Sequence, residues 1–381
     1  MKPLKYLFIS SMLFVATSCG NSWLDLEPST SVDTETSIKI LSDVEFTLNG
    51  IYSTMQSSDA YSGRLVYYGD VTGDDMQAVS STKRVANYYR FNFTKDDNPS
   101  SHWSYLYSII QNCNLILMNI DKLVIDEDDK AYRDDLKGEA LAIRGLALFD
   151  LTRIFGYPYL KDNGASLGVP IIEGLSTIDS KPTRNTVAQC YTKIIDDLTQ
   201  SLSLMGEKFN KGKINKWGAM VLLSRVYLYK GENANALKMA SDAITGAEKN
   251  KYALWTNEDY PTAWGEDASA SKPGEVLFEI VNLTTDSPGK ESMGYLNSYD
   301  GYDDMCITCS FYQFLKEDPK DIRLKLLSFD KKYYAYVNKY QPQREENIED
   351  ANIPLIRLSE AYLNAAEAAV KENDNDAAVK Y

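Results

Sequence analysis

Residues 217–244 constrain the fold of this chain more than any other stretch, because they have the pattern of two helices joined by a tight turn. Gly231 stands where the chain must turn between them. Beyond it, Ala236, Ala240 and Ala243 recur at helical spacing, so one face of the second helix is lined by small residues. Two such helices can pack closely, but one pair alone leaves its apolar faces uncovered. We therefore expect a stack of helix pairs.

The same segment resembles a tetratricopeptide repeat when Gly231 is placed at the turn of the repeat. Leu223, Ser224 and Tyr227 then fall where the repeat has a leucine, a small residue and a tyrosine. The alternative is a helical hairpin of no particular family, which would pack by the same physics. The number of matching positions favours the repeat. We predict a mostly α fold, built on a tetratricopeptide-like scaffold of helix pairs that forms an α-α superhelix.

Further segments also carry apolar residues along one helical face. Thr186 and Gln189 form a capping box at the start of one of them. The expected helices cover residues 38–56, 103–120, 136–155 and 187–205. We expect the last two of these to form one helix pair, and residues 353–381 to form another.

Two long stretches, residues 59–99 and 254–350, lack clean periodicity and are rich in Gly, Asp and aromatic residues. We interpret them as loop-rich insertions laid over the scaffold, with a few short strands such as residues 275–281. Loops on rigid supports are where binding residues concentrate. Any binding site is therefore expected in these stretches.

The N-terminus has the layout of a secretory signal peptide over residues 1–18. Lys2 and Lys5 precede an apolar run over residues 6–15, and small residues then lead directly into Cys19. A cysteine in this place is where a bacterial lipoprotein receives its lipid. The alternative is an ordinary cleaved signal followed by an incidental cysteine. The apolar run is too short to cross a bilayer, so we expect a body anchored by lipid at Cys19.

Charge and rare residues exclude several classes of function. The formal net charge is −14 and no stripe of Lys or Arg is present, which argues against nucleic acid as a partner. The single histidine, His102, argues against a Ser-His-Asp or Cys-His centre and against a multi-histidine metal site. Cys306 and Cys309 form a C-x-x-C pattern, interpreted either as a local disulfide or as two unpaired thiols.

Six short motifs lie in one order over nearly the whole chain. The matching residues are 19–28, Gly73, Asp74, Asp75, Met76, Trp103, Tyr107, Ile110, Asn114, Glu139, Ala140, Ala142, Arg144, Phe155, Gly156, Pro158, Ile195, Asp197, Leu198, Arg357, Leu358, and residues 360–363 and 365–368. In this order, and behind a lipoprotein signal, they resemble the motifs of the SusD/RagB family of outer-membrane lipoproteins.

The resemblance implies a fold of four stacked tetratricopeptide-like helix pairs with a loop-rich second half. It also implies a non-enzymatic receptor, anchored in the outer membrane and facing the cell surface. Such a receptor binds oligosaccharides and delivers them to a SusC-like TonB-dependent transporter. The alternatives are a peptide-binding receptor of the RagB type and a purely protein-binding helical scaffold. A glycosidase would need two carboxylates at a fixed separation, and no pair stands out in this sequence.

The resemblance also suggests how the chain is divided. We expect the signal to be followed by an N-terminal region over 19–250, which holds the helix pairs, and a loop-rich C-terminal region over 251–381. Members of the family usually run on past the helix that contains residues 360–368, through a partner helix. This chain stops at Tyr381, near the start of that partner. We therefore expect a truncated C-terminus.

A sugar ring has an apolar face and a rim of hydroxyl groups, so its site needs aromatic faces beside Asp, Asn or Arg. Two loop regions have this mixture. The candidate ligand-binding residues are Asp74, Arg84, Tyr89 and Asn92 in the first region, and Trp255, Trp264 and Tyr299 in the second. For each aromatic residue among them, packing in the interior is the alternative role.

One cofactor comes into consideration. Asp300, Asp303 and Asp304 bring hard oxygen ligands together, as a calcium ion requires. A solvated turn is the alternative, because the spacing is not that of a helix–loop–helix calcium site. The acidic run over residues 372–376 has the same two interpretations. We expect no catalytic residue and no other metal.

Overall fold

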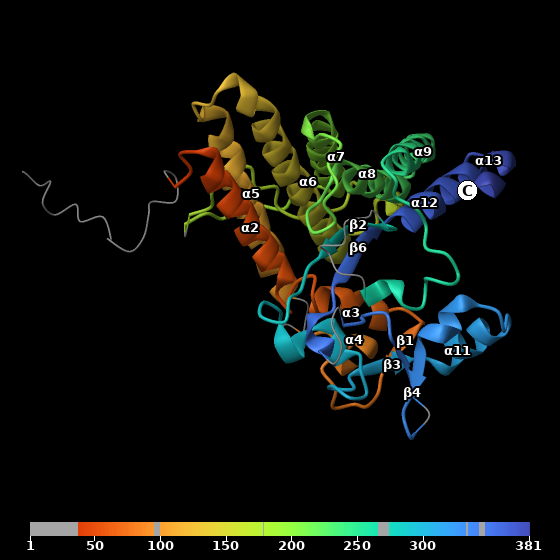
Figure 1. Ribbon diagram of the computed structural model, residues 1–381. Helices are drawn as coiled ribbons and strands as arrows, with labels where there is room; N and C mark the ends of the chain where they lie inside the picture. Colours follow the sequence, from red (N-terminus) through yellow and green to blue (C-terminus); the bar gives the residue numbers. More distant parts are fainter. Residues whose placement is uncertain (1–36, 95–99, 178, 266–273, 333, 343–346) are drawn as a thin grey trace, which may run out of the picture.

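The computed structural model of the chain describes residues 37–94, 100–177, 179–265, 274–332, 334–342 and 347–381. It has a helical half and a loop-rich half, which lie one above the other in Figure 1. The main helices of the helical half are α2 (Leu41–Gln56), α5 (Ser100–Asn119), α6 (Lys130–Phe155), α7 (Val187–Leu204), α8 (Lys216–Lys230), α9 (Asn233–Lys249), α12 (Leu358–Lys371) and α13 (Asn375–Lys380).

These helices form one continuous stack. From α5 onward each packs on the next, and α2 packs on α5. The step from α9 to α12 joins helices separated by more than a hundred residues of chain, so the loop-rich stretch is an insertion in the stack. This arrangement confirms the predicted scaffold of helix pairs. The predicted domain boundary at residue 250 stays a prediction.

Local sequence explains the best-defined pair. Helix α8 is capped at its start by Asn215, whose side chain accepts a hydrogen bond from the Gly218 amide. It is capped at its end by Gly231, which has a φ of 82° in the left-handed region that glycine adopts without strain. On α9 the alanines at 236, 240 and 243 are fully buried. The predicted turn and the predicted small face are both confirmed.

A buried ion pair ties the middle of the stack together. The Arg144 guanidinium on α6 donates to both carboxylate oxygens of Asp197 on α7, at 2.8 and 2.6 Å. It also donates to the side-chain oxygen of Asn114 on α5 at 2.8 Å. Asn114 in turn donates to the carbonyls of Ile172 and Gly174, which fixes the segment between α6 and α7. Three helices and one long connection therefore share one polar centre.

The loop-rich half is made of short elements. Its helices and strands are α3 (Arg64–Val71), β1 (Met76–Ala78), α4 (Ala86–Tyr89), β2 (Val276–Ile280), α10 (Met293–Leu296), β3 (Met305–Ile307), α11 (Cys309–Lys316), β4 (Leu327–Phe329), β5 (Ala335–Val337) and β6 (Ile353–Arg357). The strands form three two-stranded antiparallel sheets, β1 with β3, β2 with β6, and β4 with β5.

Short 3-10 helices complete the chain. They are η3 (Ile120–Lys122), η4 (Glu127–Asp129), η5 (Tyr159–Lys161), η6 (Ala263–Gly265), η7 (Gly289–Glu291), η8 (Ile322–Leu326) and η9 (Ile348–Asp350). Among all the helices of the described ranges, none is both long enough and apolar enough to cross a bilayer. The predicted signal peptide and Cys19 lie outside the described residues.

Three predictions about local structure need correction. Residues 353–357 are not the start of a helix pair but strand β6, because they pair with β2 across the insertion. The stretch 59–99 contains helix α3, whose two buried side chains leave too short an apolar pattern to show in the sequence. Cys306 and Cys309 are free thiols, one buried on β3 and one exposed on α11, so the disulfide interpretation is wrong.

Candidate aromatic binding sites

The structure brings Arg84 from the first predicted region against the second loop. Its guanidinium lies over the ring of Tyr302 at 3.9 Å from the centroid. It also forms ion pairs with Asp304 at 2.9 Å and with Glu291 at 3.3 Å. Burial raises the pKa of the Asp304 carboxyl, and Arg84 opposes that rise. Arg84 is therefore a fixed cation that joins the two loops, and about a third of its side chain (34%) stays exposed.

The neighbouring turn holds Tyr299 and the acids weighed for calcium. Tyr299 is 46% exposed, and its ring lies 5.9 Å from that of Tyr336. Asp303 accepts a hydrogen bond from the Tyr336 hydroxyl and faces the Lys83 ammonium at 3.6 Å. The described part of the chain holds no group of three or more His, Cys, Asp or Glu arranged for a metal. Calcium binding at this turn stays a prediction.

Asp74, Tyr89 and Asn92 lie at the surface of the same half. Asp74 precedes β1, and its backbone carbonyl accepts a hydrogen bond from the Thr308 hydroxyl at 2.8 Å, so its carboxylate is left at the surface. Tyr89 at the end of α4 is 37% exposed. Asn92 is exposed just beyond it, in a turn held by a backbone bond to Asn87. These placements fit residues that are accessible to a ligand.

Sequence reasoning missed two aromatic residues next to them. Phe91 and Phe93 are 63% and 40% exposed, with ring centroids 6.2 Å apart. Phe93 also contacts Tyr68 and Tyr88, and we call these four residues the α4 cluster. Phe91 has a φ of 53°, an unusual conformation for a bulky side chain and one that marks functional positions in other proteins. The aromatic run over residues 88–93 was the signal available in the sequence.

Trp255 and Trp264 form a second site with Tyr260, which we call the tryptophan cluster. The two indole rings lie 4.9 Å apart, and Tyr260 lies 5.5 Å from Trp264, all edge to face. Trp264 is only 4% exposed, so it is mainly a wall of this site rather than an open platform. Two cations lie over its ring, Lys339 at 4.7 Å and Arg357 at 4.8 Å.

A cavity of about 330 Å³ opens beside the tryptophan cluster. It lies where α12 leaves β6. Its walls are Trp264, Lys339, Tyr340, Pro354, Leu355, Arg357, Ser359, Glu360 and Leu363. The mixture of apolar, hydroxyl and charged groups is typical of a site that binds a small polar molecule.

Helix α3 connects the two clusters. Tyr68 of the α4 cluster and Asp70 both lie on it. Burial raises the pKa of the Asp70 carboxyl to about 6; the charge of Lys339 opposes the rise and that of Asp75 adds to it. Asp70 therefore interacts electrostatically with Lys339, which lies over the Trp264 ring, and with Asp75 in the turn before β1.

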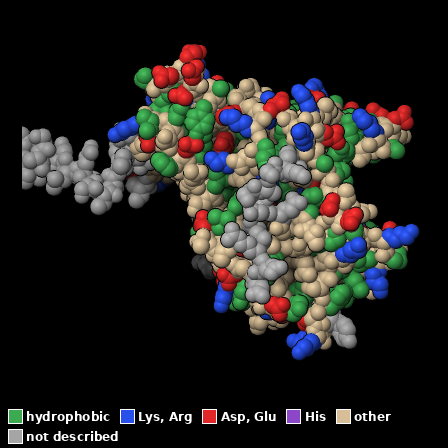
Figure 2. Space-filling view, viewed as in Figure 1, with side chains coloured by type: hydrophobic (Ala, Val, Ile, Leu, Met, Phe, Trp, Pro, Cys, Tyr) green, Lys and Arg blue, Asp and Glu red, His purple; other side chains and the backbone are tan. Residues whose placement is uncertain are grey.

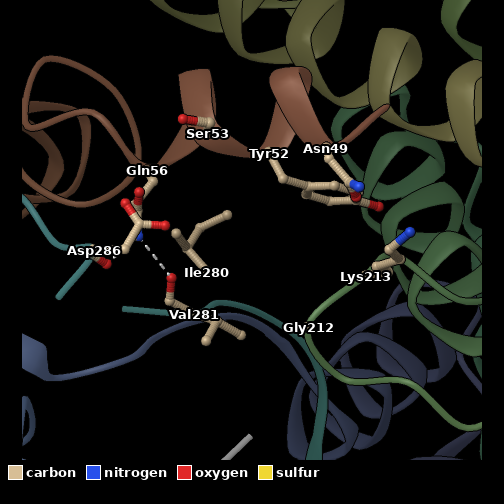
Figure 3. Close-up of a pocket in the computed structure, with 9 residues that line it drawn as sticks. All are labelled: Asn49, Tyr52, Ser53, Gln56, Gly212, Lys213, Ile280, Val281 and Asp286. Atoms are coloured by element: carbon tan, nitrogen blue, oxygen red, sulfur yellow. Dashed lines mark hydrogen bonds between the residues drawn. The ribbon is translucent and has the colours of Figure 1, made fainter. Parts of the chain in front are cut away.

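A separate cavity of about 190 Å³ lies between α2 and the end of β2 (Figure 3). Its polar side chains hold the structure together, since the Gln56 amide donates to the carbonyls of Val281 and Asp286 at 3.0 and 2.7 Å. The Tyr52 hydroxyl accepts from the Ile214 amide. None of the predicted site residues lines this cavity. We interpret this cavity as a packing gap between α2 and the insertion.

The fold and these sites define a class: a helical-repeat scaffold whose inserted loops carry exposed aromatic and charged groups. A family model described as "Starch-binding associating with outer membrane" matches residues 22–228, and one described as "SusD family" matches residues 324–381. The first match alone covers more than half of the chain. The chain belongs to the SusD/RagB family, as its motifs predicted.

Solved structures agree. A putative sugar binding protein from Bacteroides vulgatus ATCC 8482 is 82% identical, with a TM-score of 0.89 over 91% of this chain and 77% of that one. A SusD superfamily protein from Bacteroides thetaiotaomicron VPI-5482 is 36% identical, with a TM-score of 0.82 over 89% of this chain and 78% of that one. Among curated proteins, SusD-like protein P2 of Formosa agariphila is 27% identical, over 79% of this chain and 57% of that protein. The chain thus spans little more than half the length of that relative.

Proposed function

We propose that this protein is a surface lipoprotein that binds oligosaccharides and passes them to a SusC-like TonB-dependent transporter in the outer membrane. It acts without catalysis. The observation that carries the proposal is the set of exposed aromatic side chains on the loop-rich half: Tyr89, Phe91, Phe93 and Tyr299 are each at least 37% exposed. Such faces can stack on the C–H side of sugar rings, and Arg84, Asp74 and Asn92 supply polar groups beside them.

Membership of the family and the 82% identical putative sugar binding protein support a glycan as the ligand. The mixed surface charge is consistent with this, because Figure 2 shows acidic and basic side chains interspersed over the visible face. A ligand recognised by stacking and hydrogen bonds does not need a strong field of one sign. Peptide binding is the competing outcome of the experiment below.

Isothermal titration against a panel of neutral oligosaccharides, acidic oligosaccharides and peptides tests the proposal. We expect at least one glycan to bind. Phe91→Ala and Tyr299→Ala should weaken it at least tenfold, about 1.4 kcal/mol each. Tyr157→Ala is the matched control, because Tyr157 is 56% exposed on the helical half. Binding of peptides alone, or an equal loss in the control, would contradict the proposal.

The anchor has its own test. We propose that Cys19 carries the lipid, and Cys19→Ala should leave the protein unlipidated and soluble after export. Metabolic labelling with an alkyne fatty acid reports the lipid directly. If the variant is still tagged, the anchor lies elsewhere.

The transporter and the absence of catalysis are tested separately. Affinity purification of the lipidated protein from outer membranes of its host should recover a TonB-dependent transporter, identified by mass spectrometry. Incubation with the bound glycan should release no new reducing ends. Steady turnover would make the protein an enzyme and overturn that part of the proposal.

A further inference from the structure

We propose that the cavity of the tryptophan cluster binds an anionic sugar residue, whose negative group pairs with Lys339 and Arg357. This inference rests on the proposed function and specifies its ligand class: a glycan with uronate or sulfate groups rather than a neutral one. The ring of such a residue would lie against the apolar wall formed by Trp264 and Leu363.

The charged side chains around the cavity favour the binding of an anion. Within the described residues, the Lys339 ammonium forms no ion pair with a carboxylate and contacts the Trp264 ring instead. The one acid in the wall, Glu360, is already bound at both oxygens by Arg225, at 2.5 and 2.7 Å. Among the described residues that line the cavity, Lys339 and Arg357 therefore outnumber the acids, and Asp70, which acts on Lys339 from outside this lining, offsets them only in part.

Arg357 is partly engaged, because only one of its side-chain nitrogens has a hydrogen bond to a described residue. One of its terminal nitrogens donates to Glu275 at 2.8 Å, which fixes the guanidinium at the cavity wall. A guanidinium has five N–H donors, and a planar fork of two can meet a carboxylate or a sulfate. Glu275 also accepts from the Ser359 hydroxyl at 2.5 Å. Arg357 is thus held in place before a ligand arrives, which reduces the entropy cost of binding.

The environment of Lys339 agrees with this geometry. Burial and the neighbouring Arg357 and Arg323 lower the pKa of Lys339 to about 8, whereas Asp70 and Glu275 raise it. The pKa stays depressed although Asp70 and Glu275 oppose the shift, so these acids compensate the ammonium only in part. An anion in the cavity would add to that compensation. A neutral sugar would occupy the same volume without adding a counter-charge, so the cavity should discriminate between the two.

Saturation-transfer NMR with single sugars tests the inference at pH 7. The probes are D-glucuronate, D-galacturonate and D-glucose 6-sulfate, with D-glucose, D-galactose and methyl D-glucuronate as neutral partners of the same size. We expect at least one acid to bind at least tenfold more tightly than its neutral partner. Comparison of the uronates with the sulfate shows which anion the site accepts, and either result supports the inference. Equal binding of acids and neutral partners would overturn it.

Variants locate the site. Lys339→Met should abolish the preference for the acid, and Lys339→Arg should retain it. Lys325→Met, at an exposed lysine of the same half, should have no effect. If Lys339→Met keeps the tenfold preference, the acid binds elsewhere and the inference fails.

Wild-type protein gives a second measurement that does not depend on how a variant folds. Binding needs the protonated ammonium, so affinity for the acid should fall as the pH rises through about 8. Unchanged affinity up to pH 10 would overturn the inference. If neutral oligosaccharides bind while acidic sugars show no preference, the inference fails but the proposed function stands. If no glycan of any kind binds, the proposed function fails.

Discussion

Two cations, one in each half of the molecule, are compensated in different ways. In the helical half, Arg144 has 8% of its side chain exposed and meets Asp197 and Asn114 with three hydrogen bonds. In the loop-rich half, Lys339 lies over an indole ring without a carboxylate partner among the described residues. A scaffold gains stability from charges that are satisfied internally, whereas a binding site keeps some charges for its ligand. The comparison of Arg144 with Lys339 therefore distinguishes the scaffold from the binding surface.

Replacing Arg144 with methionine tests the helical half and has the largest expected effect. The change leaves the fully buried Asp197 carboxylate with Lys193, at 3.3 Å, as its remaining cation. Breaking a buried pair by removing one partner costs about 3–5 kcal/mol, and we expect a loss of this size in the free energy of unfolding by urea.

The control for Arg144→Met is Arg323→Met in the loop-rich half. Arg323 has 48% of its side chain exposed and pairs with Asp321. Exposed pairs contribute at most about 1 kcal/mol, so its loss should be small. Equal losses in the two variants would show that the halves do not differ in this way.

The pH dependence of stability tests the loop-rich half. Because the pKa of Lys339 falls from 10.5 to about 8 on folding, the unfolded chain binds more protons between these values. This lysine therefore destabilises the folded protein by at most about 3 kcal/mol below pH 8. The destabilisation disappears as the pH rises to 10.5. The measurement is the difference in unfolding free energy between wild type and Lys339→Met, in which other groups cancel. A flat difference across this range would contradict the prediction.

Two glycines test how tightly the helical half is packed. A methyl group at Gly246 on α9 would lie 2.1 Å from the Trp217 ring, so Gly246→Ala should cost about 1–3 kcal/mol through overpacking. At Gly50 on α2 nothing lies within 4 Å, and Gly50→Ala should gain up to about 1 kcal/mol from helix propensity. Thermal unfolding of both variants gives the comparison. A stabilising Gly246→Ala would mean that α8 and α9 are not in close contact there.

The smallest effect concerns the thiols of the C-x-x-C segment and leaves stability unchanged. Cys309 is exposed, whereas Cys306 is buried and burial raises its pKa to about 11. Iodoacetamide at pH 8 should therefore alkylate Cys309 and spare Cys306, as peptide mapping by mass spectrometry will show. Protection of both residues that disappears on reduction would reveal a disulfide instead.

The helical half was largely predictable, because its signals are local. Gly231, the capping box at Thr186 and the alanines of α9 each specify a turn, a start or a packing face within a few residues. Strand β6 was not predictable in the same way. Its five residues form a strand because β2, some seventy positions earlier, lies beside them. The periodicity of so short a segment does not distinguish the two structures.

The candidate sites were predictable in part. Arg84 and Tyr299 were chosen from two separate loops, but the contacts of Arg84 with Tyr302 and Asp304 span more than two hundred residues. Trp264 was predicted to bind a ligand because of its aromatic ring. The structure shows that the ring is largely buried and that two cations lie over it. Lys339 carries no motif, so nothing in the sequence placed it over that ring.

The sequence by itself determined the family, the helical scaffold and the residue types available for binding, because helical periodicity and short motifs act over neighbouring positions. Only the tertiary structure decided which of those residues meet. It placed α12 on α9, joined Arg84 to the distant turn, and left Lys339 at the wall of a cavity without an ion pair to any described residue. The physical reason is that charge compensation and burial depend on neighbours in space, and in long insertions these neighbours are far apart in the chain.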